Sequence, residues 1–326
     1  MVYCLSLAVR QKKVKGLGTV EKLTNSRIMA RQMCPTKEFL QYSERLRPIG
    51  VQWALSIGTA WHAGLEAWGQ GADEDAAVQV GLATLEWIES TDPETMFKLE
   101  LERARVEVMV RQAIRRFLPR NMTAVEMEFE VPILNPRTGK KSRSFALGGK
   151  ADGVAEINGK LWLIENKTTG YTLDQFREGY GLNNQISLYL HAVSRYIGKP
   201  LAGAILRVVA KTRTEPKKSK GEVVESWDDY KARLMDLYDM ESERFLTEDT
   251  VYRTPDQLAQ FENELWTETQ ERLWQQKSGV IRHNTSSCGD YGGCPFKSIC
   301  LGVGGAKESL FRVSETTHDE LPSESA

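Results

Sequence analysis

Two carboxylates and a lysine lie close to a predicted tight turn in the middle of the chain. Asn158-Gly159 is typical of a two-residue β-hairpin turn, because both central positions of a type I′ turn need a positive φ. If this turn closes the hairpin, Asp152 lies directly opposite Glu165, with its side chain on the same face of the sheet. Lys167 follows Glu165 by two residues and therefore shares that face.

These three side chains have the chemistry of a hydrolytic metal site. Two carboxylates that face each other across one rung of a sheet repel each other unless a cation lies between them. Mg²⁺ or Mn²⁺ would supply that cation, since both take oxygen ligands and keep positions for water and a substrate phosphate. Lys167 could then position a water or stabilise charge on the phosphorus centre. The pattern predicts metal-assisted hydrolysis of a phosphodiester; the alternative is an exposed cluster in which the lysine neutralises one acid.

Two predicted helices carry further polar side chains that suit such a site. Gln185 and Tyr189 are four residues apart, so they share one helix face and could both point at the carboxylates. His62 lies one turn before Glu66 on an apolar helix and could give a nitrogen ligand to the same metal. The alternatives are ordinary helix surface for the first pair and a buried core position for His62.

The elements that must position these residues follow from the spacing of apolar and turn-forming residues. Helices are predicted at 56–68, 98–118 and 174–198, and two helical segments are predicted between 226 and 278. Strands are predicted at 123–134, 142–157, 160–169 and 201–211. The first three strands form an antiparallel meander, and the helix after them crosses over the sheet to the fourth strand. This order of elements predicts an α/β core.

Composition and charge exclude several classes of protein. The 326 residues are 41% hydrophobic and 27% charged, and no stretch approaches the roughly 20 apolar residues that span a bilayer, which excludes a membrane channel or transporter. Lys and Arg (43) nearly balance Asp and Glu (44), so any contact with nucleic acid depends on local clusters of charge. In the N-terminal segment the basic residues follow a short apolar run, the reverse of a secretory signal, which indicates a cytoplasmic protein.

The cysteines form a second candidate site. Five cysteines in a chain without a secretory signal indicate metal binding rather than a disulfide framework. Cys288, Cys294 and Cys300 lie on a glycine-containing loop that can fold around a metal centre. A fourth thiolate would complete a tetrahedral set, and the sequence offers Cys34 or Cys4 for it. Four thiolates suit an iron-sulfur cluster or a closed zinc site, although zinc sites usually contain two close cysteine pairs.

Four short motifs follow one another along the chain: Gly58-x3-His62, Asp152 after GGKA, Glu165-x-Lys167 followed by two threonines, and Gln185-x3-Tyr189. In this order and spacing they resemble the RecB-type branch of the PD-(D/E)XK nucleases. The resemblance extends over nearly the whole chain up to Cys300. It implies a restriction-endonuclease-like fold, in which helices flank a mixed β-sheet.

The resemblance also implies a role for each of these residues. The metal ligands would be His62, Asp152 and Glu165, and the carbonyl of Asn166 would face the metal. The catalytic lysine would be Lys167, and the helix pair that orients the active site and the DNA would be Gln185 and Tyr189. Every position that the branch uses for catalysis is therefore filled in this sequence.

The same resemblance bears on the choice among the cysteines. Cys34 is followed by proline, aromatic residues and arginine, which is similar to the N-terminal half of the iron-sulfur motif of this branch. In the CRISPR-associated adaptation nuclease and in cysteine-bearing helicase-nuclease subunits, one N-terminal and three C-terminal cysteines hold a [4Fe-4S] cluster. The implied ligands are Cys34, Cys288, Cys294 and Cys300, which leaves Cys4 over. The spacing departs from the commoner one, in which two C-terminal cysteines lie closer together, and zinc is the alternative.

These observations lead to one expected organisation and function. We expect a nuclease domain at 1–302, with its core at about 123–211, helical parts at 24–118 and 226–302 that the cluster joins, and a weakly ordered tail at 303–326. The expected activity is Mg²⁺- or Mn²⁺-dependent exonuclease cleavage of single-stranded DNA ends, in recombination, repair or phage- or CRISPR-type DNA processing, with a recombination or helicase protein as a partner. One alternative is a DNA-binding or assembly subunit that does not cut. Another is an iron-sulfur or zinc module whose carboxylates are structural.

Overall fold

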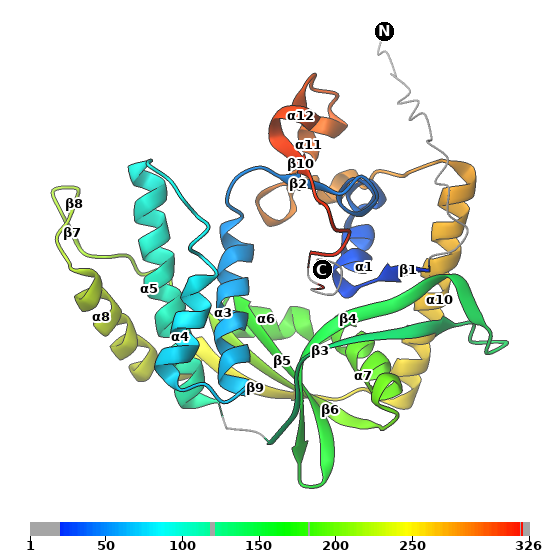
Figure 1. The fold of residues 1–326 in the computed structure, drawn as a ribbon, viewed down its shortest axis with the longest axis horizontal. Coiled ribbons are helices and arrows are strands. Elements are labelled where there is room, and N and C mark those ends of the chain that lie inside the picture. Colours follow the sequence, from blue (N-terminus) through cyan, green and yellow to red (C-terminus); the bar gives the residue numbers. More distant parts are fainter. Residues whose placement is uncertain (1–19, 118–120, 182, 320, 322–326) are drawn as a thin grey trace.

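The computed structural model describes residues 20–117, 121–181, 183–319 and 321, and a mixed sheet of six strands forms its centre (Figure 1). The strands are β1 (Glu21–Leu23), β3 (Asn121–Leu134), β4 (Lys141–Ile157), β5 (Lys160–Thr169), β6 (Leu201–Ala210) and β9 (Leu246–Val251). Their order is β1-β4-β5-β6-β9, and β3 pairs with β4 outside this path. The pairs β1–β4 and β5–β6 are parallel and the others are antiparallel. The predicted α/β fold with a mixed sheet flanked by helices is confirmed.

The hairpin that joins β4 to β5 has the predicted turn and register. Asn158 and Gly159 have φ values of 51° and 72°, as a type I′ turn requires. The ladder runs in the predicted register as far as the pair Gly153–Ile164. Asp152 is therefore the first residue of β4 beyond the part that pairs with β5.

Two helices connect β5 to β6, where the sequence predicts one helix at 174–198. α6 (Leu173–Tyr180) ends before α7 (Asn184–Ile197) begins, and β6 then runs parallel to β5. The interruption has a local cause, because the side chain of Asn183 caps α7 and accepts a hydrogen bond from the main chain of Gln185 at 2.7 Å. The predicted continuous helix is therefore wrong, and the cap places Gln185 in the first turn of α7.

Helices flank the sheet in two groups. α3 (Trp53–Gly69), α4 (Glu74–Ala83), α5 (Pro93–Arg116) and α8 (Trp227–Met240) pack in this order at the left of Figure 1. α10 (Pro255–Ser278) packs beside α7 at the right. The helices predicted at 56–68 and 98–118 are confirmed, since α3 and most of α5 cover them. No helix in the described part of the chain combines the length and apolar character needed to cross a membrane.

Two strands of the sheet, β1 and β9, are not predicted from the sequence. β9 lies within the stretch from 226 to 278 that is predicted as helical, and the short helix α9 (Ser242–Phe245) precedes it. β9 is the last strand of the sheet, and an edge strand can be polar and lack a strong apolar alternation. β1 has three residues, too few to show a periodic pattern. Apart from the sheet, β7 (Lys218–Ser219) and β8 (Glu222–Val223) form a small hairpin.

A smaller apolar cluster lies where the N-terminal and C-terminal segments meet, at the top of Figure 1. The N-terminal segment contributes α1 (Asn25–Met33), α2 (Pro35–Glu38), a π-helical turn (Phe39–Ser43) and β2 (Leu46–Pro48). The C-terminal segment contributes a 3₁₀-helix (Thr285–Gly292), α11 (Lys297–Cys300), α12 (Ala306–Leu310) and β10 (Phe311–Val313). β10 pairs with β2, and the buried residues of the cluster are Leu40, Leu46, Phe296 and Phe311. We call this unit the terminal lobe.

Part of the terminal lobe differs from the weakly ordered tail that the sequence predicts at 303–326. α12 and β10 lie in this stretch, and Phe311 stacks on Phe296 with ring centroids 5.1 Å apart. His318 is also buried, with 2% of its surface exposed. The stretch is mostly polar, so its sequence does not predict that a few of its residues pack against partners far away in the chain. Residues 320 and 322–326 of the predicted tail lie outside the described residues.

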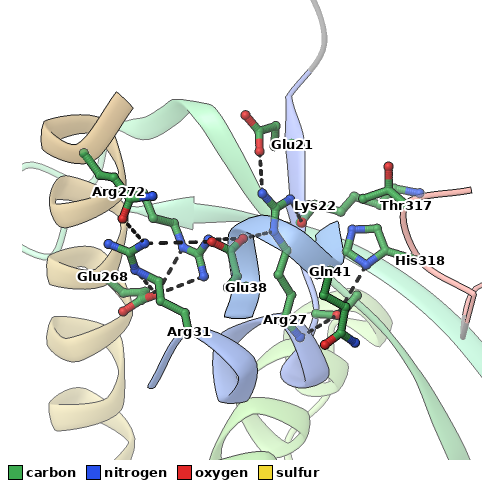
Figure 2. A network of polar contacts seen from close by, with 12 residues as sticks. Glu21, Lys22, Arg27, Arg31, Glu38, Gln41, Glu268, Arg272, Thr317 and His318 are labelled. Carbon is green, nitrogen blue, oxygen red and sulfur yellow. Dashed lines mark hydrogen bonds and ion pairs between the residues drawn. The ribbon is translucent and has the colours of Figure 1, made fainter. Parts of the chain in front are cut away.

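A buried network of charges connects the terminal lobe to α10 (Figure 2). The carboxylate of Glu38 accepts hydrogen bonds from Nε of Arg27 at 2.7 Å and from Nη1 of Arg272 at 2.8 Å. Arg31 and Arg272 both pair with Glu268, at 3.2 and 3.0 Å. Burial alone would raise the pKa of Glu38, but Arg272 and Arg27 hold this pKa below its ordinary value. The network therefore holds α1 and α2 against α10.

Replacing the central acid of this network should destabilise the protein strongly. Glu38→Gln leaves Arg27 and Arg272 buried without their shared carboxylate, so we expect the free energy of unfolding to fall by about 3–5 kcal/mol. Denaturant or thermal unfolding measures this loss. Glu21→Gln is the control, because Glu21 binds the same Arg27 at 2.8 Å but has a side chain that is 43% exposed, and its loss should cost about 1 kcal/mol or less. Equal losses in the two variants would contradict the role given to Glu38.

Candidate active site

Asp152 lies at the point where β4 and β5 separate. Its Oδ2 accepts a hydrogen bond from the main-chain N of Asn166 at 2.6 Å, so the carboxylate binds β5 just beyond the last ladder pair. β1 pairs with the same edge of β4 at 145–147, and the described strands leave 148–152 unpaired on that edge. This gap in the sheet gives the side chain of Asp152 room to reach across to β5.

α3 brings His62 to the same carboxylate. Nδ1 of His62 is 3.4 Å from Oδ1 of Asp152. Burial alone would lower the pKa of His62, but the charge of Asp152, its hydrogen bond to His62 and the charge of Glu165 together raise this pKa above its ordinary value. Burial alone would raise the pKa of Asp152, but His62 and Lys167 hold this pKa below its ordinary value. The structure therefore brings together the histidine and the aspartate of the predicted site.

Glu165 is almost completely buried, with 1% of its surface exposed. Its Oε1 accepts a hydrogen bond from Nε2 of Gln185 at 2.7 Å and lies 2.6 Å from Nζ of Lys167. Burial raises the pKa of Glu165, and the negative charge of Asp152 raises it further. Burial would lower the pKa of Lys167, but Glu165 and Asp152 outweigh burial and raise it, so the lysine is held as a cation. The acid and the lysine of the predicted motif thus form an ion pair in which the carboxylate is buried and the lysine is partly exposed.

α7 supplies the residues that hold Glu165 in place. Oε1 of Gln185 accepts a hydrogen bond from the hydroxyl of Tyr180 at 3.3 Å, which orients the amide toward Glu165. Tyr189, one turn later on α7, is 8% exposed and meets the ring of Phe129 edge-on, with the centroids 5.7 Å apart. Burial raises the pKa of Tyr189, and the charge of Glu165 raises it further. The predicted helix pair therefore lies beside the buried acid, with Gln185 in direct contact with it.

Glu126 on β3 is a residue of this site that the sequence analysis missed. Its side chain is 10% exposed and forms an ion pair with Lys150. One ligand atom from each of His62, Glu126 and Asp152 lies within 4.8 Å of the other two, and this group does not include Glu165. Burial raises the pKa of Glu126, and the charge of Asp152 raises it further. The β3–β4 register shifts between Pro132 and Leu134, so the turn that joins the two strands does not predict which residue of β4 lies opposite Glu126.

The four described cysteines lie together in the terminal lobe, and all are free thiols. Sγ of Cys34, between α1 and α2, accepts a hydrogen bond from the main chain of Asn284 at 3.3 Å. The main-chain N of Cys294 donates to the carbonyl of Cys288 at 3.0 Å. Burial raises the pKa of Cys300, and the charges of the other three cysteines raise it further. The structure therefore brings the predicted N-terminal cysteine to the three C-terminal ones.

The chain matches the PD-(D/E)XK nuclease superfamily over residues 22–301, a range that holds both groups of residues. It belongs to this superfamily. No curated protein matches this PD-(D/E)XK chain. Among solved structures, one titled "Crystal structure of SSO0001" is similar at 14% sequence identity, covering 66% of this chain and 83% of the other, with a TM-score of 0.23. A similarity at this level carries no argument about function.

PD-(D/E)XK nucleases typically use a divalent metal such as Mg²⁺, and the residues of this site fit such an ion. Asp152, Glu165 and Glu126 offer carboxylate oxygens, and His62 offers a ring nitrogen. Oε2 of Glu165 is buried and has no hydrogen-bond partner among the described residues. A buried acceptor without a donor is costly, so this oxygen is suited to a cation.

Removing the lysine should make the stability of the protein depend more on divalent ions. In Lys167→Met the buried Glu165 loses its ammonium partner, and we expect the metal-free protein to lose roughly 1–3 kcal/mol of unfolding free energy. Because a bound cation replaces the missing charge, Mn²⁺ should raise the melting temperature more in this variant than in the wild type. Thermal unfolding with EDTA and with Mn²⁺ measures both effects.

Lys98→Met provides the matched control for this comparison. Lys98 pairs with the buried Glu102 at 2.6 Å, and this pair lies on α5, outside the candidate site. The control should lose stability without any gain in its response to Mn²⁺. If Mn²⁺ stabilises Lys167→Met no more than wild type, Glu165 is not part of the metal site.

Proposed function

We propose that this protein is a metal-dependent DNA nuclease that hydrolyses phosphodiester bonds. The observation that carries the proposal is the buried Glu165, which Gln185 and Lys167 hold through Oε1 while Oε2 is left without a partner. Asp152 and His62 lie beside it as a second pair of ligand groups. An acid held in this way, next to a lysine and a second acid, suits the binding of a divalent ion and of a phosphate.

Each residue of the site has a role in this proposal. Asp152 and Glu165 would hold Mg²⁺ or Mn²⁺, with His62 and the carbonyl of Asn166 as further ligands. The ion would polarise the phosphate and lower the pKa of a bound water. Lys167 contributes a positive charge beside the reacting phosphate.

α7 would hold the acid in position for this chemistry. Gln185 fixes the orientation of Glu165, and Tyr189 closes the site beside it against Phe129. Both side chains are mostly buried, so they would exclude water from the back of the site. Neither needs to change its protonation state, since the amide does not titrate and burial raises the pKa of the tyrosine.

We further propose an exonuclease that acts on single-stranded DNA ends, in recombination, repair or phage- or CRISPR-type DNA processing, together with a recombination or helicase protein. This part of the proposal depends on the resemblance of the motif series to the RecB-type branch. The filled catalytic positions favour a cutting enzyme over a non-cutting DNA-binding or assembly subunit. The protein would degrade or trim a strand that a partner has exposed.

We also propose that Cys34, Cys288, Cys294 and Cys300 hold a [4Fe-4S] cluster with a structural role. Supporting this proposal, the four thiols are free and the three neighbouring cysteines all act on the pKa of Cys300. Iron-sulfur clusters are commonly held by four thiolates. Zinc is the alternative ion for the same ligands. Such a centre would join the segment that carries α1 and α2 to the segment that carries α11.

Cleavage of end-labelled DNA tests the nuclease activity. The wild type should cut in Mg²⁺ or Mn²⁺ and not in EDTA, and Asp152→Asn should reduce the rate about 10³-fold or more, because a metal contributes several kcal/mol to the transition state. Glu130→Gln is the control, since Glu130 lies on β3 with a side chain that is 54% exposed and should cut at the wild-type rate. Single-stranded and duplex substrates, labelled at either end, report strand and end preference. A folded wild type that cuts none of these substrates would favour the non-cutting subunit.

Metal analysis of protein purified without oxygen tests the cluster. We expect about four iron atoms per chain and a charge-transfer absorbance, both lost in Cys34→Ala, with a lower melting temperature. Cys4→Ala is the matched control, because Cys4 lies outside the described residues and is not a proposed ligand; its iron content should equal that of the wild type. A colourless protein that contains zinc would contradict the iron-sulfur assignment.

A further inference from the structure

The hairpin that joins β3 to β4 ends in a strongly basic tip. Residues 135–144 contain four cations and no acidic residue, although the chain as a whole has a net charge of −1. All four cations are exposed: Arg137, Lys140, Lys141 and Arg143. Figure 1 shows this hairpin extending away from the centre of the sheet at the right. We call residues 135–144 the basic finger.

The charge of the basic finger is not compensated by the protein itself. Within the described residues, none of its four cationic side chains forms an ion pair with a carboxylate. Other exposed cations do form such pairs, for example Arg115 with Glu74 at 2.7 Å and Lys307 with Glu44 at 2.6 Å. Four like charges within one hairpin tip repel one another, and an external polyanion would remove this repulsion.

The basic finger also has a defined shape. Oδ1 of Asn135 accepts a hydrogen bond from the main-chain N of Arg137 at 2.9 Å. The carbonyl of Asn135 accepts another from the N of Gly139 at 2.8 Å, and Gly139 has a φ of 67°. On the β4 side, Oγ of Ser142 accepts from the main-chain N of Phe145 at 3.1 Å. Because the turn is already ordered, binding through it would cost little backbone entropy.

The strand β4 connects the basic finger directly to the candidate active site. Lys141 lies eleven residues before Asp152 on this strand, and β3 pairs with β4 at both ends of the stretch between them. At about 3.3 Å per residue, the two residues are up to about 35 Å apart. One helical turn of duplex DNA is about 34–36 Å long, so a duplex presents the same side of its backbone again at this distance.

The form of the basic finger favours duplex DNA as its partner. It is the tip of a two-stranded β-ribbon, and the major groove of B-DNA admits an element of this size. Its arginines and lysines would contact the phosphates that border the groove. An acidic protein would match the charge as well, but the same ribbon carries Asp152 of the proposed nuclease site, whose substrate is itself a polyanion.

We propose that the basic finger binds the phosphate backbone of duplex DNA about one helical turn away from the phosphodiester at the active site. The protein would thereby bind a duplex next to the DNA end on which it acts. The placement of the finger relative to the cut rests on the proposed function, whereas the binding of duplex DNA does not. Contacts to phosphates carry no sequence information, so this binding is independent of sequence.

Equilibrium binding of labelled DNA to the full chain in EDTA, followed by fluorescence anisotropy, tests the basic finger without cleavage. We expect the finger variant to bind a duplex of about two helical turns at least about tenfold more weakly than the wild type. The slope of log affinity against log salt concentration should fall by about 3–4, because each phosphate contact contributes about 0.9. The finger variant combines Arg137→Gln, Lys140→Gln, Lys141→Gln and Arg143→Gln.

A control variant changes the net charge by the same amount outside the basic finger. It removes four cations that each pair with a carboxylate and whose side chains are 39–69% exposed. Its salt slope should equal that of the wild type, and equal losses in the two variants would overturn the proposal. The control variant combines Arg115→Gln, Arg116→Gln, Arg244→Gln and Lys307→Gln.

Two single variants keep the test decisive if the fourfold finger variant does not fold, which circular dichroism will show. Lys140→Gln and Arg143→Gln each remove one exposed charge, and each should lower the salt slope by about 0.9. Wild-type slopes in both single variants would overturn the proposal.

Cleavage kinetics in Mn²⁺ locate the basic finger relative to the active site. On DNA ends flanked by about 16 base pairs, the finger variant should keep the wild-type kcat and have a KM at least about tenfold higher. On flanks of about 6 base pairs, which are shorter than one turn, the two proteins should have the same KM. A rise in KM that does not depend on the length of the duplex, or that is equally large on single strands, would overturn the proposal.

The two assays also separate this proposal from the proposed function. If the wild type binds duplex DNA through the finger but cuts none of the substrates, the nuclease function is wrong and the finger remains a DNA-binding surface. If the wild type cuts and the finger variant binds DNA as the wild type does, the finger proposal is overturned and the nuclease stands. An acidic protein would then be the partner that fits the finger.

Discussion

The conflict between burial and negative charge at the centre of the sheet is the constraint on which the site depends. Asp152 and Glu165 belong to adjacent strands, and a buried carboxylate is unstable unless donors or cations compensate it. Each acid obtains its partners from a different part of the chain. Asp152 binds the main chain of β5 and meets His62 from α3, whereas Glu165 binds Gln185 from α7 and Lys167 from its own strand. Packing of these helices against the sheet therefore makes the acidic centre stable and also shapes it as a site for cations.

The same constraint applies where the terminal lobe meets α10, but there the buried groups in excess are positively charged. Three buried arginines would repel one another there, and Glu38 together with Glu268 compensates them. The elements that carry these charges are far apart in the chain, so neutralising them also joins α1 and α2 to α10. Cys34 lies between α1 and α2, and this charge network helps to determine its position relative to the C-terminal cysteines. The two candidate sites of the protein are thus both positioned by compensation of buried charge.

Elements that depend on interactions between residues close in the chain follow from the sequence, and elements that depend on distant partners do not. Asn158-Gly159 specifies the β4–β5 register because the turn and the strands that it joins are contiguous in the chain. The meander and the helices α3 and α5 have strong local patterns and were predicted in the same way. The break between α6 and α7 depends on the Asn183 cap, a single side chain within a stretch that the sequence predicts as one helix. β1 and β9 are short strands that form only because distant strands offer them an edge, so their own residues did not reveal them.

The sequence by itself determined the chemical groups of the protein and their order: the acid, the acid-x-lysine motif, the helix pair, His62 and the cysteines. These follow from residue type and short spacing, which do not change when the chain folds. Only the tertiary structure decided that Glu126, paired with Lys150, lies beside Asp152 and His62. The reason is physical: the β3–β4 register shifts between Pro132 and Leu134, beyond the reach of the turn, and a shift of one residue turns the side chains of β3 to the opposite face. That register is set by the packing of the whole sheet.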